Sequence, residues 1–89
     1  MFEWHREKDL INIAKHGVNF DVAKRIFAGS TLTWVDERED YGEVRKISIG
    51  MADDTAVLVV VHTDRNDRIR LISARPASQR ERKLYHERI

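Results

Sequence analysis

The chain has 89 residues, of which 42% are hydrophobic and 35% are charged, which suffices for one domain with a modest core but not for two. Its longest apolar run, Ala56 to Val61, is much shorter than the roughly 18 to 20 residues of a membrane span, and residues 1–7 lack the basic and apolar regions of a secretory signal. The absence of cysteine excludes disulfides, thiol nucleophiles and cysteine-ligated zinc. We therefore predict a single domain over residues 1–89 that is cytoplasmic and makes no membrane contact.

The formal net charge of +1 conceals an uneven distribution of charge along the chain. Residues 1–64 carry 8 Lys and Arg against 12 Asp and Glu, whereas residues 65–89 carry 8 against 3. A basic C-terminal segment fits a polyanionic partner such as a nucleic acid, although a solvated helix face can carry the same charges.

Two helices are predicted before any substantial strand. The first covers residues 6–16, and the second is a short helix over residues 19–28 that Asn19 would cap and Gly29 would end. Apolar residues at helical spacing predict the buried face of the first helix. They are Leu10, Ile13 and Ala14.

Four strands are predicted at residues 31–35, 45–51, 55–62 and 68–75. Residues 55–62 form a continuous apolar run rich in Val, which is typical of a central strand covered on both faces. Turns are expected at residues 36–42, 52–55 and 64–67, so the strands form an antiparallel meander. Residues 2–4 would at most add a short strand.

A third helix is predicted after Pro76. Ser78 and Glu81 match a capping box, in which each side chain bonds the backbone amide of the other residue, and the helix continues to about Arg88. The fold class is therefore α+β, with two N-terminal helices, a four-stranded antiparallel sheet and a C-terminal helix. Helices on one face of the sheet would leave the other face free to bind.

The first candidate site is the segment His62-Thr63-Asp64-Arg65, where a buried strand is predicted to end at the rim of the sheet. Histidine suits proton transfer near neutral pH, and the arginine fork donates two hydrogen bonds to a phosphate. The competing interpretation is that His62 is a satisfied histidine at a strand end and Arg65 an ordinary turn residue.

The second candidate site joins the end of the last strand to the basic final helix. Arg75 and Arg80 would bind the scissile phosphate, and Tyr85 would stack on a base or bond a phosphate. The alternative is a solvated helix surface with Tyr85 and Leu84 packed inward, in which the capping box accounts fully for Glu81.

Several classes of active site are excluded by the absence of their motifs. The chain has no GxGxxG, P-loop or GxSxG sequence, and its four histidines lack metal-ligand spacing. We therefore predict no cofactor and no metal. The remaining chemistry is metal-free RNA cleavage through the 2′-hydroxyl, in which a base takes its proton, Arg or Lys stabilises the phosphorane and an acid protonates the 5′-oxygen.

Six short strings, in order along nearly the whole chain, resemble the BrnT toxin family. They are Phe2-Glu3-Trp4, Lys15-His16-Gly17-Val18, Gly42-Glu43-Val44-Arg45, His62-Thr63-Asp64-Arg65, Arg68-Ile69-Arg70-Leu71-Ile72-Ser73-Ala74-Arg75 and Glu81-Arg82-Lys83-Leu84-Tyr85. One departure is His5, which stands where the family usually has an aspartate that caps the first helix. The resemblance implies a RelE-like fold, a metal-independent endoribonuclease that halts translation, and neutralisation by a BrnA antitoxin with a ribbon-helix-helix DNA-binding domain. The complex would repress its own operon, so the toxin would reach operator DNA only through the antitoxin.

The resemblance also implies residue roles. His62 would be the acid or base, Arg65, Arg75 and Arg80 would bind phosphate, and Tyr85 would hold a base. Glu81 belongs to the same set, and both Glu81 and Lys15 are chemically able to act as the base. Further RNA contacts are predicted at Lys15, His16, Arg68, Arg70, Arg82 and Lys83. The alternative function is a non-catalytic partner-binding module or co-repressor that acts with a ribbon-helix-helix protein.

Overall fold

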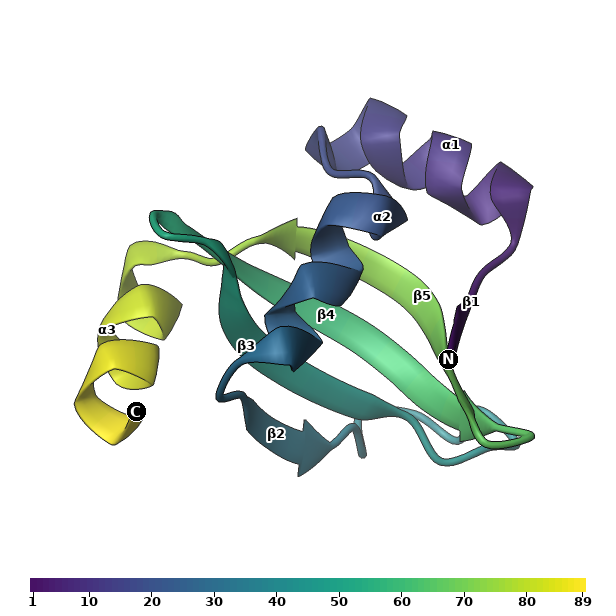
Figure 1. Cartoon of the computed structure of the whole chain (residues 1–89). Coiled ribbons are helices and arrows are strands. Elements are labelled where there is room, and N and C mark those ends of the chain that lie inside the picture. Colours follow the sequence, from purple (N-terminus) through teal and green to yellow (C-terminus); the bar gives the residue numbers. More distant parts are fainter.

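The computed structural model describes all residues 1–89 as a sheet with three α-helices and one 3-10 helix (Figure 1). The elements in chain order are β1 (Phe2–Glu3), α1 (Arg6–His16), α2 (Phe20–Ala23), the 3-10 helix η1 (Lys24–Ala28), β2 (Leu32–Val35), β3 (Lys46–Asp53), β4 (Ala56–Arg65), β5 (Arg68–Pro76) and α3 (Gln79–Arg88). No helix is both long and apolar enough to cross a membrane.

The sheet has five strands in the order β1-β5-β4-β3-β2. The predicted antiparallel meander is confirmed for β2 to β5, but β1 adds a fifth strand that runs parallel to β5. The prediction of a four-stranded, purely antiparallel sheet was therefore wrong. A strand of two residues is too short to show the alternation of apolar residues from which strands are predicted.

One face of the sheet is covered by α2 and η1. Phe20, Ala23 and Ile26 are fully buried against apolar residues of β4 and β5, and burial of side chains of the size of Phe or Ile stabilises a fold by about 1.5 to 3 kcal/mol each. Gly50 lets η1 approach β3 closely, because a Cβ at this position would lie 2.8 Å from the Cβ of Ile26.

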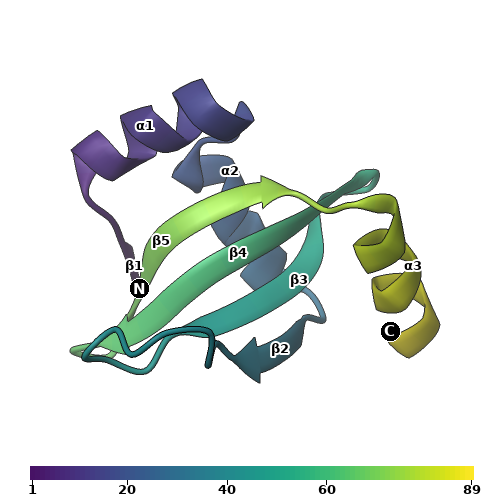
Figure 2. The ribbon, with the colours of Figure 1, turned by 180° about the vertical axis from the view of Figure 1, so that it is seen from behind.

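The opposite face is covered at one end by α3 (Figure 2). The capping box of Ser78 and Glu81 is formed, with both reciprocal hydrogen bonds. Tyr85 packs against apolar residues of β3 and β4, and its hydroxyl donates to the carbonyl of Ser30 at 2.9 Å. The expectation that all helices cover one face was therefore wrong.

Helix α1 lies against the outer edge of β5, with its polar side inward. The predicted buried residues Leu10, Ile13 and Ala14 are exposed, whereas Asn12 is buried. Because β1 pairs only with Ile69 and Arg70, the edge of β5 near Ala74 has no neighbouring strand. A polar side chain is needed there, and helical periodicity alone cannot reveal that need.

Asn12 supplies the missing partner for that edge. Its amide nitrogen donates to the carbonyls of Ala74 and Val18, each at 2.8 Å, and its carbonyl oxygen accepts from the amide of Ala74 at 3.1 Å. One side chain therefore closes the ladder and joins α1 to β5. His5, by contrast, makes no side-chain cap for α1.

We expect Asn12→Ala to lower the free energy of unfolding by roughly 2 to 4 kcal/mol, because it removes three hydrogen bonds and leaves buried backbone groups unpaired. Urea denaturation measures this loss. Ile11→Ala is the control on the same helix, since Ile11 is 63% exposed and its truncation should change stability little. Equal stabilities of the two variants would contradict the role of Asn12.

Candidate nucleic-acid interface

His62 and Arg75, which come from the two predicted clusters, lie on opposite faces of the sheet. Strand β4 does not end at His62 but continues to Arg65, and it then turns through Asn66 and Asp67, both with positive φ, as in a two-residue hairpin turn. His62 is therefore inside a strand, on the face covered by η1. Arg75 pairs in register with Val59, which belongs to the opposite face.

His62 is 4% exposed, which does not support its predicted role as acid or base. Its Nε2 lies 2.7 Å from Oγ of Ser48, and its ring packs edge-on against Phe27 at 4.9 Å between centroids. Burial lowers the pKa of His62 to about 4, so the ring is neutral at neutral pH. An RNA strand cannot reach it without displacing η1.

Tyr85 is also buried, at 5% exposure. Its ring is part of the core, and its hydroxyl is engaged by Ser30, so it has no free face on which a base could stack. The interpretation that Tyr85 packs inward is the one that fits the structure, whereas Leu84 is exposed.

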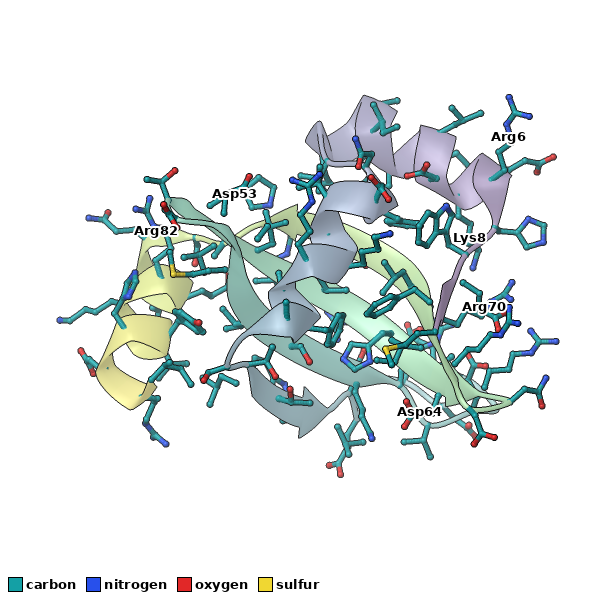
Figure 3. The ribbon with its side chains drawn as sticks, viewed as in Figure 1. Arg6, Lys8, Asp53, Asp64, Arg70 and Arg82 are labelled. Atoms are coloured by element: carbon teal, nitrogen blue, oxygen red, sulfur yellow. The ribbon has the colours of Figure 1, made fainter.

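The basic residues of the C-terminal segment are divided between the two ends of the sheet (Figure 3). Arg65 and Arg68 pair with each other at the tip of the β4–β5 hairpin. Arg70 forms an ion pair with Glu3 at 2.8 Å and is largely covered. At the other end α3 carries Arg80, Arg82 and Lys83 on exposed positions, with Lys83 4.0 Å from Glu87.

A groove of about 490 Å³ lies on the face of the sheet that carries α3, between the ends of α1 and α3. Its apolar floor is formed by Ile47, Val59 and Val61, with Ser73 beside them. The polar and aromatic side chains around this floor are Lys15, His16, Trp34, Arg38, Arg75 and Glu81. Four basic side chains from three separate parts of the chain thus surround one cavity.

Arg75 is held in the groove by Glu81. Two guanidinium nitrogens donate to the two carboxylate oxygens, at 2.7 and 2.8 Å, a bidentate arrangement that fixes the plane of the arginine. Hydrogen bonds from Arg75 lower the pKa of Glu81 to about 2, so this carboxylate is ionised and a weak base. Glu81 also accepts from the amide of Ser78 at 2.9 Å and so anchors the start of α3.

Arg38 is fixed in a similar way by Asp36. Its Nε and Nη2 donate to the two oxygens of this buried carboxylate, each at 2.8 Å. The backbone amide of Arg38 and the hydroxyl of Tyr41 donate to the same carboxylate, each at 3.1 Å. The hydrogen bonds from Arg38 hold the pKa of Asp36 well below its usual range. The Arg38 side chain itself is 68% exposed, which leaves its outer edge available to an anion.

Lys15 and His16 reach the groove because α1 ends there, at Gly17, which has the positive φ of a left-handed cap. Both were predicted as outer contacts. Trp34 and Arg38 were not predicted, since one lies on an edge strand and the other in a loop between strands. Four other lining residues of this groove were predicted from the sequence, namely Lys15, His16, Arg75 and Glu81. The tryptophan in a β-branched strand was a further signal that could have pointed to it. No group of three or more His, Asp or Glu side chains comes together as a metal site.

Comparison with known proteins identifies the class. A family model described as the ribonuclease toxin BrnT of type II toxin-antitoxin systems matches residues 4–81. The 1.1 Å crystal structure of the Brucella abortus ribonuclease toxin BrnT superposes with a TM-score of 0.71 and 25% identity, over 89% of this chain and 99% of that chain. No curated protein matches the chain.

These similarities place the chain among the ribonuclease toxins of type II toxin-antitoxin systems. It belongs to the BrnT toxin family, so the resemblance drawn from its sequence is confirmed. Membership of this family implies an RNA substrate and an antitoxin partner.

The burial of His62 predicts a pH dependence of stability. Its pKa is about 4 in the folded chain against about 6.5 when unfolded. The unfolded chain therefore binds more protons between these values, and stability falls by about 3 kcal/mol as the pH drops from about 6.5 to 4. We expect His62→Gln to remove this fall in denaturation experiments across the range.

His86→Gln is the matched control, because His86 is exposed on α3, and it should retain the pH dependence of the wild type. If wild type and His62→Gln lost stability in parallel below pH 6.5, His62 would not be the responsible group.

Proposed function

We propose that the groove is the active site of a metal-independent endoribonuclease. The observation that carries this proposal is the convergence of Lys15, His16, Arg38 and Arg75 around one cavity. Arg38 and Arg75 are each held by a carboxylate, so they can donate to a phosphate without losing much side-chain freedom on binding.

The proposed reaction is transfer of the phosphate ester to the 2′-hydroxyl. His16 takes the 2′-hydroxyl proton, the 2′-oxygen attacks the adjacent phosphorus, and the 5′-oxygen leaves with a proton from the Lys15 ammonium. Arg38 and Arg75 stabilise the charge on the phosphorane. The products are a 2′,3′-cyclic phosphate and a 5′-hydroxyl end. His16 here replaces His62, and Glu81 positions Arg75 rather than acting as the base.

Trp34 and the exposed cations of α3 extend the proposed RNA contacts. Trp34 is 41% exposed beside the apolar floor, and single-stranded bases stack on such rings. Arg80, Arg82 and Lys83 would follow the backbone beyond the groove. Arg65 and Arg68 lie at the far hairpin and would meet only a longer RNA.

The cellular role we propose is arrest of translation by RNA cleavage in the cytoplasm, relieved by a BrnA-like ribbon-helix-helix antitoxin through which the pair would repress its operon. A RelE-like relationship of the fold remains a prediction. The alternative function is a module that binds the antitoxin as a co-repressor and cuts no RNA.

Cleavage of a labelled single-stranded RNA in EDTA tests the proposal. We expect wild type to cut, and His16→Ala and Arg75→Ala to be slowed by about 100-fold or more, because each loses a group that acts on the reacting phosphate. Arg65→Ala is the control, since it removes the same charge at the far hairpin, and it should cut within about twofold of wild type. Circular dichroism confirms that each variant is folded.

If Arg65→Ala lost cleavage while Arg75→Ala retained it, the active site would lie at the β4–β5 hairpin and not in the groove. Cleavage that stops in EDTA and returns with a divalent cation would contradict metal independence. A wild-type chain that binds its antitoxin and cuts no RNA would favour the co-repressor module.

Binding should also depend steeply on salt. Each phosphate neutralised on a single strand contributes about 0.7 to the slope of log affinity against log salt. With an RNA blocked at its 2′-oxygens by methylation, we expect Arg75→Ala to reduce the slope by about that amount and Arg65→Ala to leave it unchanged for a short RNA. A slope near zero in wild type would exclude the charged groove as the RNA contact.

A further inference from the structure

Helix α1 displays an apolar surface that the fold does not use. Leu10 is 56% exposed, Ile11 63% and Ile13 41%. The attachment of α1 is polar instead, through Asn12 at the edge of β5 and through Asp9, whose carboxylate accepts from the amide of Phe20 at 2.8 Å. An amphipathic helix with its apolar side turned to solvent marks a surface that another molecule covers.

This surface is continuous with the proposed active site. A groove of about 270 Å³ runs between α1 and β5, with Ile11 and Ile72 as its apolar residues. This groove shares three lining residues with the larger groove that we propose as the active site, namely Lys15, His16 and Ser73. A chain that lies on the apolar side of α1 and enters the smaller groove therefore arrives at the residues that we propose move the protons.

The charges beside this surface indicate which kind of partner it binds. Lys8 and Lys15 line the groove next to Ile11, and neither has an ion-pair partner within the chain, whose ion pairs all lie elsewhere. Figure 3 shows Lys8 on the side of α1 that faces the sheet and Arg6 on its outer side. An acidic partner would neutralise both lysines.

We propose that the surface formed by Leu10, Ile11 and Ile13, with the groove beside it, docks an apolar and acidic segment of the antitoxin. This inference rests on the proposed function, since it requires a toxin with an antitoxin. The apolar side chains of the segment pack on Leu10 and Ile11, and its carboxylates pair with Lys8 and Lys15. RNA is then excluded because the segment covers the Lys15 and His16 side of the active site.

The test uses a BrnA-like antitoxin that binds the wild-type chain, mixed with wild type or with the double variant Leu10→Ser, Ile11→Ser. Both residues are exposed and outside the proposed active site, so the variant should cut RNA like wild type. We expect the affinity of the double variant for the antitoxin to fall by about 100-fold or more. The double variant should also continue to cut RNA at an antitoxin concentration that inhibits cleavage by wild type. Lys8→Glu should weaken binding by about tenfold.

Val44→Ser is the matched control, because Val44 is an apolar residue that is 64% exposed in the loop before β3. This variant should bind the antitoxin with the affinity of wild type. Wild-type affinity in the double variant would overturn the proposal. A free chain that sediments as a dimer, and as a monomer after the double substitution, would assign the surface to a second copy and also overturn it. Failure of the proposed ribonuclease is separately visible as absence of RNA cleavage in wild type, while the antitoxin affinities still decide the docking surface.

Discussion

The pairing of Asn12 with the open edge of β5 is the contact on which the arrangement of the molecule depends. Because β1 is only two residues long, the backbone of Ala74 would be left without a partner, and one amide side chain completes it. This contact forces α1 to turn its polar side inward. The same rotation places Lys15 and His16 at the groove and leaves Leu10 and Ile11 facing solvent, so one requirement of the backbone arranges both proposed binding surfaces.

The alternation of side chains along β4 separates structural from functional polar groups. Val60 and His62 point to the face covered by η1, whereas Val59 and Val61 form the floor of the RNA groove. A histidine on the covered face is desolvated and neutral, which makes it a packing residue with one hydrogen bond to Ser48. The proposed chemistry therefore uses side chains that surround the groove on the other face of the sheet.

The sequence was sufficient to predict the helical segments and the strands β2 to β5, because their periodicities and caps are local, but it did not separate α2 from the 3-10 helix η1. The capping box of Ser78 and Glu81 and the cap at Asn19 are formed as predicted. The site was harder to predict, since it depends on which face each strand residue occupies. The turn was predicted directly after His62, so this residue was expected at the rim of the sheet, whereas it lies inside β4. Arg38 lies in a loop, where neither strand alternation nor helical periodicity predicts the direction of a side chain.

Glu81 shows how one carboxylate links the fold to the proposed chemistry. It begins α3 by accepting from Ser78, and it holds Arg75 with two hydrogen bonds. An arginine has five N–H donors, so three remain for a phosphate after Glu81 is satisfied, apart from a weak contact to the carbonyl of Pro76 at 3.4 Å. Since the pKa of Glu81 is about 2, its carboxylate stays ionised at neutral pH and keeps both hydrogen bonds with Arg75. The Arg75 side chain is therefore ordered during folding, and its loss of conformational entropy does not reduce the affinity for RNA.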